Sequence, residues 1–165
     1  MRPRAFTALA SLSPSKLCSA LSQGMALIAE HVATLSAAAA AENGPGGARA
    51  TAAVSVVADE EAAKYLILLD AARAARLPAE IRSRQLRRCS LHIPKGVYAE
   101  VVDIRPDRFD ELIGYVDSLR VTHYLDGPND VDWVFRNRVE ESREDRLYVD
   151  PVSYTHLTLP TNREV

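Results

Sequence analysis

Cysteine is scarce in this chain: its 165 residues include only Cys18 and Cys89, with no CxxC pair and no cluster of cysteine and histidine. A disulfide framework or a zinc site is therefore not expected, and two isolated thiols suit a reducing cytosol. Glycine is also scarce, at 7 residues, and β-branched runs are few. Because alanine is abundant instead, the composition favours helices over strands. We expect neither a metal ion nor another cofactor.

Neither a large net charge nor a long apolar run stands out. The net charge is −2, which argues neither for nor against nucleic acid as a partner. No apolar run approaches the length that spans a bilayer, so we expect a cytoplasmic protein without a membrane partner. Hydrophobic residues make up 47% of the chain and charged residues 25%, as in ordinary soluble domains. The length suffices for one domain with a hydrophobic core.

Basic residues are nevertheless concentrated between residues 73 and 95. This stretch holds a single acid, Glu80, and seven cationic side chains: Arg73, Arg76, Arg82, Arg84, Arg87, Arg88 and Lys95. Two interpretations stay open. The stretch forms a patch that contacts phosphate groups, or it is a solvated helix face.

The character of the sequence divides the chain into three segments. We expect residues 1–13 to be disordered, residues 14–151 to form one helical domain, and residues 152–165 to be an artefactual tail. From Val152 onward, a Thr/Leu/Pro-rich string that resembles a translated sequencing adapter replaces an acidic, arginine-rich sequence. On this interpretation the natural domain is truncated near Pro151.

Apolar spacing predicts helices along most of the domain. Over residues 15–42 apolar side chains recur every three or four positions, and the glycine-rich residues 43–47 end that helix. A second helix is expected over residues 48–75, and the short turn between two long helices predicts antiparallel pairing. Its expected inward residues are Val54, Val57, Tyr65, Leu68, Leu69 and Ala72.

Further helices are expected after Pro78. A third helix carries the basic stretch and should kink or stop beside His92, because Pro94 disfavours helical geometry just before it. A short helix should cover residues 95–103, and another residues 106–125, with Phe109, Leu112, Ile113, Val116 and Leu119 inward. A last short helix holds Trp133. The predicted fold class is an all-α antiparallel helical bundle.

The segment with the clearest chemistry runs from Arg87 to His92: an arginine, four intervening residues and a histidine. Arginine binds phosphate through a planar fork of donors, and histidine exchanges a proton near neutral pH. On an ideal helix Arg88 shares a face with His92, whereas Arg87 points elsewhere. A helix break at Ile93 would swing the imidazole toward either arginine, so both remain candidates.

Four short segments follow one another in a defined order. They are ALSQGMAL at residues 20–27, EEAAK at 60–64, RRCSLH at 87–92 with Lys95 behind it, and RLYVD at 146–150. In this order the chain resembles the AbiV-type abortive-infection family, a branch of the all-helical HEPN superfamily. The resemblance implies a HEPN-like bundle that dimerises, so that two motifs face each other across a shared cleft. Many members cleave RNA without a metal.

The resemblance therefore implies a metal-independent ribonuclease of a bacterial abortive-infection system, which defends against phage. His92 would transfer the proton, and Arg87 or Arg88 would stabilise the charge of the transition state. Three further cations would bind the RNA backbone: Arg82, Arg84 and Lys95. Glu60 and Lys64 would support the motif electrostatically, or they form a simple surface pair.

The expected partners are RNA, a second copy of the chain, and an antitoxin or a phage protein. One alternative is a non-catalytic helical dimer that binds a nucleic acid or a partner protein. A structural bundle with a chance motif is the third class. The positions of His92 and of Arg87 or Arg88 distinguish these classes. Exposure of both in a concave basic cleft at a two-fold face favours the enzyme, whereas burial of His92 against Leu91 and Tyr98 excludes it.

Overall fold

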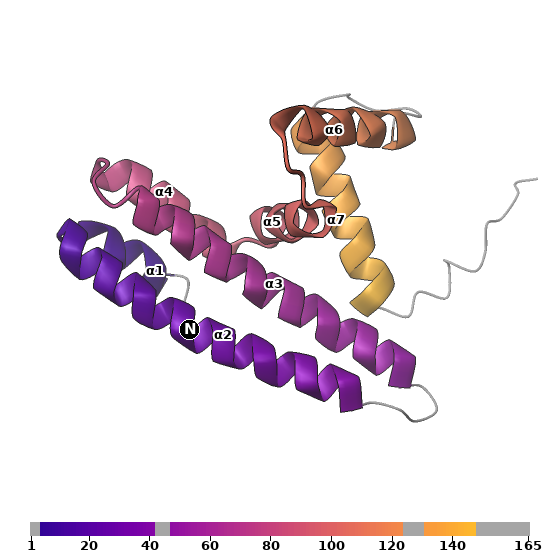
Figure 1. Cartoon of the computed structure of the whole chain (residues 1–165), viewed down its shortest axis with the longest axis horizontal. Helices are drawn as coiled ribbons and strands as arrows, with labels where there is room; N and C mark the ends of the chain where they lie inside the picture. Colours follow the sequence, from indigo (N-terminus) through magenta and orange to yellow (C-terminus); the bar gives the residue numbers. More distant parts are fainter. Residues whose placement is uncertain (1–3, 42–46, 124–130, 148–165) are drawn as a thin grey trace, which may run out of the picture.

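The computed structural model describes residues 4–41, 47–123 and 131–147, and within these ranges the chain is all-α, with no strand (Figure 1). The predicted fold class is therefore confirmed. The helices are α1 (Arg4–Ala8), η1 (Leu9–Ser11), α2 (Pro14–Ala41), α3 (Gly47–Arg73), α4 (Ala79–Arg87), η2 (Arg88–Ser90), α5 (His92–Ile104), α6 (Phe109–His123) and α7 (Val131–Leu147). Residues 152–165, expected to be an artefactual tail, lie outside the described residues.

Helices α2 and α3 form the long antiparallel hairpin that the sequence predicts (Figure 1). Near the start of α2, Leu17 and Leu21 are fully buried against Ile67 and Leu68 of α3. Toward the other end, the Thr51 hydroxyl donates a hydrogen bond of 3.1 Å to the Ala39 carbonyl. The pairing thus extends along both helices, because each one buries an apolar face that would otherwise contact water.

The N-terminal segment is ordered where the sequence predicted disorder. Residues 4–11 form α1 and η1, which pack against α4. Ala10 is buried in the main core, and Phe6 and Leu9 pack against that core. The expectation that residues 1–13 are disordered is therefore wrong for residues 4–11, because these apolar side chains bind a surface contributed by a distant part of the chain.

Helices α5, α6 and α7 build the second half of the molecule. α5 and α7 both pack against α3, and α6 packs on α7 (Figure 1). A smaller core forms around Leu119 of α6 and Phe135 of α7. α5 and α7 cross closely at Gly96, where an added Cβ would lie only 2.2 Å from Cγ1 of Val139. This crossing determines where α7 places its side chains relative to α5.

Some side chains predicted to face inward are exposed. Val57 and Tyr65 of α3 are more than a third exposed, whereas Ala63 and Ala71 are buried. The reason is that α3 packs against α2, α4, α5 and α7 together, so its buried surface does not follow a single stripe. On α6, Phe109 and Ile113 are exposed and Leu119 is buried, because the helix has one principal neighbour, α7.

Helix α2 is also more apolar than its uninterrupted runs of apolar residues indicate. It contains an 18-residue window with a mean hydropathy of 1.3, and it is long and apolar enough, by length and composition alone, to cross a membrane. The expectation that no apolar stretch approaches that length is therefore wrong, because alanines sustain the hydropathy between the larger side chains. A single helix of this kind near an N-terminus is weak evidence for a membrane, since core helices and signal sequences share the property.

Candidate functional site

His92 is the first residue of α5, and the chain breaks its helical path just before it. α4 ends at Arg87, the tighter η2 follows, and Leu91 is extended, with φ −114° and ψ 134°. A break beside the histidine is present as predicted, but it lies at Leu91, before His92, and not at Ile93, which is helical. Pro94 lies inside the first turn of α5, where proline is tolerated because no intrahelical partner is needed for its missing N–H. The new helix therefore starts at His92, three residues earlier than predicted.

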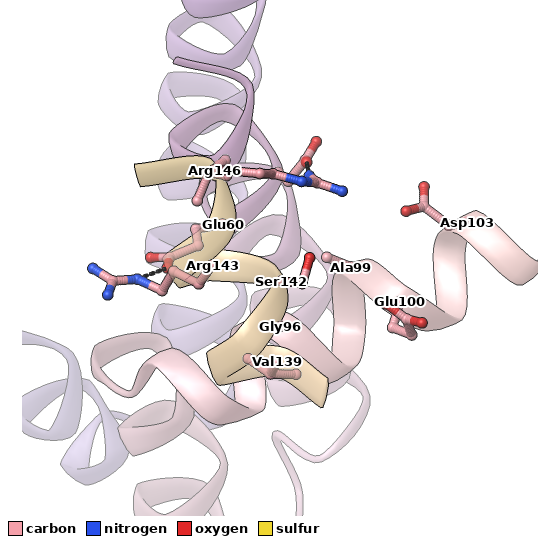
Figure 2. Close-up of a pocket in the computed structure, with 11 residues that line it drawn as sticks. Glu60, Gly96, Ala99, Glu100, Asp103, Val139, Ser142, Arg143 and Arg146 are labelled. Carbon is pink, nitrogen blue, oxygen red and sulfur yellow. Dashed lines mark hydrogen bonds and ion pairs between the residues drawn. The ribbon is translucent and has the colours of Figure 1, made fainter. Parts of the chain in front are cut away.

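One carboxylate, Glu60 of α3, gathers side chains from two other helices. His92 Nδ1 lies 2.9 Å from Glu60 Oε1 and 3.1 Å from Oε2. Lys95 of α5 donates a hydrogen bond to Oε2. Arg143 Nε of α7 donates to Oε1 at 3.2 Å, as Figure 2 shows. We call these four residues the Glu60 cluster. The cluster connects α3, α5 and α7 at one point.

The centre of the Glu60 cluster is largely removed from water. The side chain of Glu60 is 17% exposed and that of Lys95 only 7%. Burial acts to raise the pKa of the Glu60 carboxyl, but hydrogen bonds from Lys95 and His92 outweigh it and hold that pKa below its ordinary value. Glu60 is therefore ionised at neutral pH, as a partly buried carboxylate bound by cations should be.

The imidazole of His92 is oriented by this carboxylate and remains accessible, with its side chain 57% exposed. Because ionised Glu60 only accepts hydrogen bonds, a neutral His92 carries its proton on Nδ1 and directs it toward Glu60. Nε2 then has a free lone pair, and it makes no hydrogen bond with any residue in the described ranges. An orienting carboxylate on one ring nitrogen and a free second nitrogen suit a general base.

The accessible side of His92 faces a groove between α5 and α7. His92, Pro94 and Val97 line it from α5, and Phe135, Val139 and Arg143 line it from α7. Arg136, Glu140 and Glu144 also border the groove and are exposed. The lining of the groove thus combines apolar side chains, a histidine and exposed charged side chains of both signs.

The arginines of the sequence motif do not contact the histidine. No hydrogen bond joins His92 to Arg87 or Arg88 in the part of the chain that the structure describes. Arg87 is exposed, whereas Arg88 donates a hydrogen bond to Gln85. Arg88 lines a second pocket together with Arg73 and Arg84. The functional groups that the local spacing suggested would act together thus have different partners and line different pockets.

Two of the predicted RNA-binding residues have other roles. Arg82 is half-buried, and its Nη1 donates to the carbonyls of Leu12 and Ala75 at 3.0 and 3.1 Å. It ties the N-terminal segment to the end of α3. Lys95 is buried against Glu60. Each cation thus binds acceptors of the chain itself, and these contacts lend no support to the predicted RNA-binding role of Arg82 or Lys95. Arg84 is exposed, as RNA binding would require.

Glu60 and Lys64 do not pair, although they lie one helical turn apart. Lys64 instead forms an ion pair with Glu61, and Glu60 points toward α5 and α7. The surface-pair interpretation is therefore wrong. Glu60 contacts the motif histidine, whereas no bond connects Lys64 to His92 within the described ranges. The buried Lys95 attracts the Glu60 carboxylate more strongly than a solvated lysine would.

Sequence reasoning missed Arg143. It comes from α7, far along the chain from His92, so no local motif contains both residues. A faint signal exists, since Arg136 and Arg143 lie two turns apart and so share one face of a helix. Nothing in the sequence shows that this face packs against α3 and α5.

Other routes to catalysis find little support in this part of the molecule. Burial raises the pKa of the Cys89 thiol to about 11, so almost no nucleophilic thiolate is present at neutral pH. Among the described residues, no three His, Cys, Asp or Glu side chains are arranged to hold a metal ion.

The comparisons with known proteins give no relative from which to transfer a role. No protein-family model, curated protein or solved structure matches this chain. The chemistry is therefore inferred from the Glu60 cluster and the groove beside it.

Proposed function

We propose that this chain is a metal-independent ribonuclease of the bacterial abortive-infection type, with His92 as its general base. One observation carries the proposal: a partly buried carboxylate holds Nδ1 of His92, while the exposed imidazole lines an open groove and its Nε2 makes no hydrogen bond with any described residue. A histidine kept only for packing would be buried, and a surface histidine would have no buried, ionised partner that fixes its tautomer. The resemblance to the AbiV-type family supplies the substrate class, RNA.

The proposed reaction needs only groups that RNA and this chain provide. Nε2 of His92 accepts the proton of a ribose 2′-hydroxyl, and the 2′-oxygen forms a bond to the adjacent phosphorus. The bond from phosphorus to the 5′-oxygen breaks, and that oxygen takes a proton from water. The products are a 2′,3′-cyclic phosphate and a 5′-hydroxyl. Because the nucleophile belongs to the substrate, its proximity is already secured. Ionised Glu60 stabilises the imidazolium that forms.

RNA binding is assigned to the exposed arginines around the end of α3 and along α4 and η2. We call this group the arginine patch, and it consists of Arg73, Arg76, Arg84, Arg87 and Arg88. Arg73 forms an ion pair with Asp70, whereas Arg84 and Arg87 make no hydrogen bond or ion pair with any described residue. Free guanidinium groups bind phosphates without regard to base sequence, and they do so in a salt-dependent way.

The proposal also includes a cytoplasmic homodimer, with an antitoxin or a phage protein as further partner. The exposed apolar side chains Leu27, Val102 and Phe109 offer area for such contacts. Sedimentation of the purified chain measures the oligomeric state directly. Recovery of the chain in the membrane fraction after cell lysis would contradict the cytoplasmic assignment and would direct attention to α2.

The ribonuclease proposal is tested with the purified chain and a mixed single-stranded RNA in the presence of a metal chelator. We expect cleavage by the wild-type chain, and His92→Ala should reduce its rate on the order of 100-fold or more. His31→Ala is the matched control, because His31 is an exposed histidine on α2 outside the Glu60 cluster. Equal cleavage by the wild-type chain and His92→Ala, or loss of cleavage with chelator, would favour the non-catalytic dimer instead.

A further inference from the structure

We infer that Arg143 of α7, rather than Arg87 or Arg88, is the arginine that holds the scissile phosphate beside His92. The inference rests on the proposed ribonuclease function and assigns a residue to that site. It adds α7 to a site that the sequence motif places entirely between α4 and α5.

The first observation is a shared oxygen atom. His92 Nδ1 and Arg143 Nε both contact Oε1 of Glu60, at 2.9 and 3.2 Å. The imidazole and the guanidinium therefore meet at the same oxygen although they come from different helices. Both residues also line the groove between α5 and α7.

The second observation concerns the donors that Arg143 has left. Only its Nε is bound to Glu60, and in Figure 2 the two terminal nitrogens point away from that carboxylate. These nitrogens make no hydrogen bond with any residue in the described ranges, and the side chain is 30% exposed. Glu60 thus holds the guanidinium in place from one edge while leaving its other donors to a ligand. A planar fork of this kind matches two oxygens of a phosphate.

The third observation is the charge of the Glu60 cluster. One carboxylate faces two permanent cations, Lys95 and Arg143, so the cluster carries excess positive charge even when His92 is neutral. Glu140 and Glu144 also line the groove, together with Arg136, and all three are exposed. The Glu60 cluster thus adds positive charge beside the groove that His92 and Arg143 line. Such a site suits a single phosphodiester group rather than a long stretch of backbone.

In the proposed reaction, Arg143 donates hydrogen bonds to the non-bridging oxygens of the phosphate that the 2′-oxygen attacks. Those oxygens gain negative charge as the new bond to phosphorus forms and before the bond to the 5′-oxygen breaks. The two terminal nitrogens of Arg143 would strengthen their bonds as that charge grows. Arg88 is less suitable, since it is bonded to Gln85 and lines another pocket.

The test compares Arg143→Lys and Arg143→Gln with the wild-type chain on a short RNA. Lysine retains the charge next to Glu60 but lacks the fork, so we expect kcat to fall on the order of 100-fold while KM changes little. RNA with a phosphorothioate at the scissile position adds a readout that packing alone would not move. Sulfur should slow the wild-type chain more than either Arg143 variant. Circular dichroism checks that each variant is folded.

Arg138→Gln is the matched control. Arg138 also lies on α7 and its Nε also contacts a glutamate, Glu100, at 3.5 Å, but it does not line the groove. This variant should keep the wild-type kcat and the full effect of sulfur. If Arg143→Lys does the same while His92→Ala is inactive, the inference is overturned and the proposed ribonuclease function stands.

A binding experiment separates the two proposals further. Inorganic phosphate is titrated into the chain with labelled histidine, and the ring signal of His92 is assigned from the His92→Ala variant. Phosphate should shift that signal in the wild-type chain and in Arg138→Gln, but not in Arg143→Gln. An Arg143-dependent shift in a chain that cleaves no RNA would contradict the ribonuclease and retain the phosphate site. A shift that persists in Arg143→Gln would overturn the site.

Discussion

Glu60 illustrates how a single partly buried side chain sets the chemistry of its neighbours. It orients His92, compensates the charge of the buried Lys95 and leaves part of Arg143 free. Removing it would leave Lys95 charged in a site with little water, which is costly in proteins. The same residue therefore contributes to stability and to the proposed catalysis.

The first prediction concerns the stability of the variant Glu60→Gln and its dependence on pH. At pH 7 we expect the variant to be less stable than the wild-type chain by about 3 kcal/mol, because Lys95 and Arg143 lose their counter-charge. The folded pKa of Glu60 lies below its ordinary 4.5, so its contribution is complete above pH 4.5 and is lost as the pH falls through the folded pKa. The difference in the free energy of unfolding between the wild-type chain and the variant should thus become smaller in acid.

Urea denaturation at pH 7 and at pH 3.5 measures that gap. The contribution of Asp59 to stability changes with pH in the opposite direction, because burial raises its pKa. Asp59 is present in both proteins, so this contribution cancels when their free energies of unfolding are compared. An equal difference in the free energy of unfolding at both pH values would contradict the assignment of Glu60.

A second prediction at this scale concerns the two thiols. Cys89 is buried with its pKa raised to about 11, whereas Cys18 is exposed. At pH 8 a thiol reagent should therefore modify one cysteine of the folded chain and both in urea. The variant Cys18→Ser should show almost no reaction until it unfolds. Rapid modification of Cys89 in the folded Cys18→Ser chain would show that this part of the core opens readily.

Residue types and local spacing were enough to single out His92 and Glu60, but not their surroundings. The break itself lies at Leu91, before His92, whereas Ile93 and Pro94 belong to α5, so proline chemistry does not account for it. The partners of Arg82, Lys95 and Arg143 lie in distant parts of the chain, so their roles depend on tertiary packing that no spacing rule encodes.

At the scale of helices, the site depends on how closely α7 approaches α5. Gly96 allows Val139 to lie directly against the backbone of α5, and Arg143 follows one turn later on α7. The helices themselves follow from apolar periodicity and turn residues. Their crossing does not, because it depends on which small residue of one helix meets which branched residue of another.

For the packing of α5 against α7, we predict that Gly96→Ala destabilises the chain and disturbs the site. An added Cβ would lie 2.2 Å from Cγ1 and 2.7 Å from Cγ2 of Val139, so the helices must separate. We expect a loss of about 1–3 kcal/mol in the free energy of unfolding, together with slower RNA cleavage as Arg143 shifts. Adding Val139→Ala should restore part of the lost stability and part of the cleavage rate.

Gly114→Ala is the control for helix propensity. Gly114 lies within α6, and a Cβ there meets nothing within 4 Å. Alanine at this position should stabilise the chain by up to about 1 kcal/mol. Thermal unfolding of both variants compares them directly. Similar effects at Gly96 and Gly114 would mean that α5 and α7 do not approach as closely as described.

In the molecule as a whole, the Glu60 cluster and the arginine patch lie in different parts of the fold. The cluster lies where α3, α5 and α7 meet, and the patch follows the end of α3, α4 and η2. The sequence placed both functions in one basic stretch. Folding separates them, because α4 ends at Arg87 and α5 begins a new direction at His92. An RNA strand that uses both must therefore run past the break between these helices.

This separation leads to the last prediction, which concerns the salt dependence of RNA binding. In a His92→Ala background, which prevents cleavage, the logarithm of the binding constant should fall linearly with the logarithm of the salt concentration. Replacing Arg84 and Arg87 with glutamine should reduce that slope by about 0.7 for each phosphate that the variant no longer neutralises. Arg108→Gln is the control, since Arg108 is exposed and paired with Asp110 beyond the patch. Fluorescence anisotropy with a labelled single-stranded RNA measures each slope. If the double variant keeps the full slope while Arg143→Gln reduces it, RNA binds mainly through the groove, and the arginine patch has another partner.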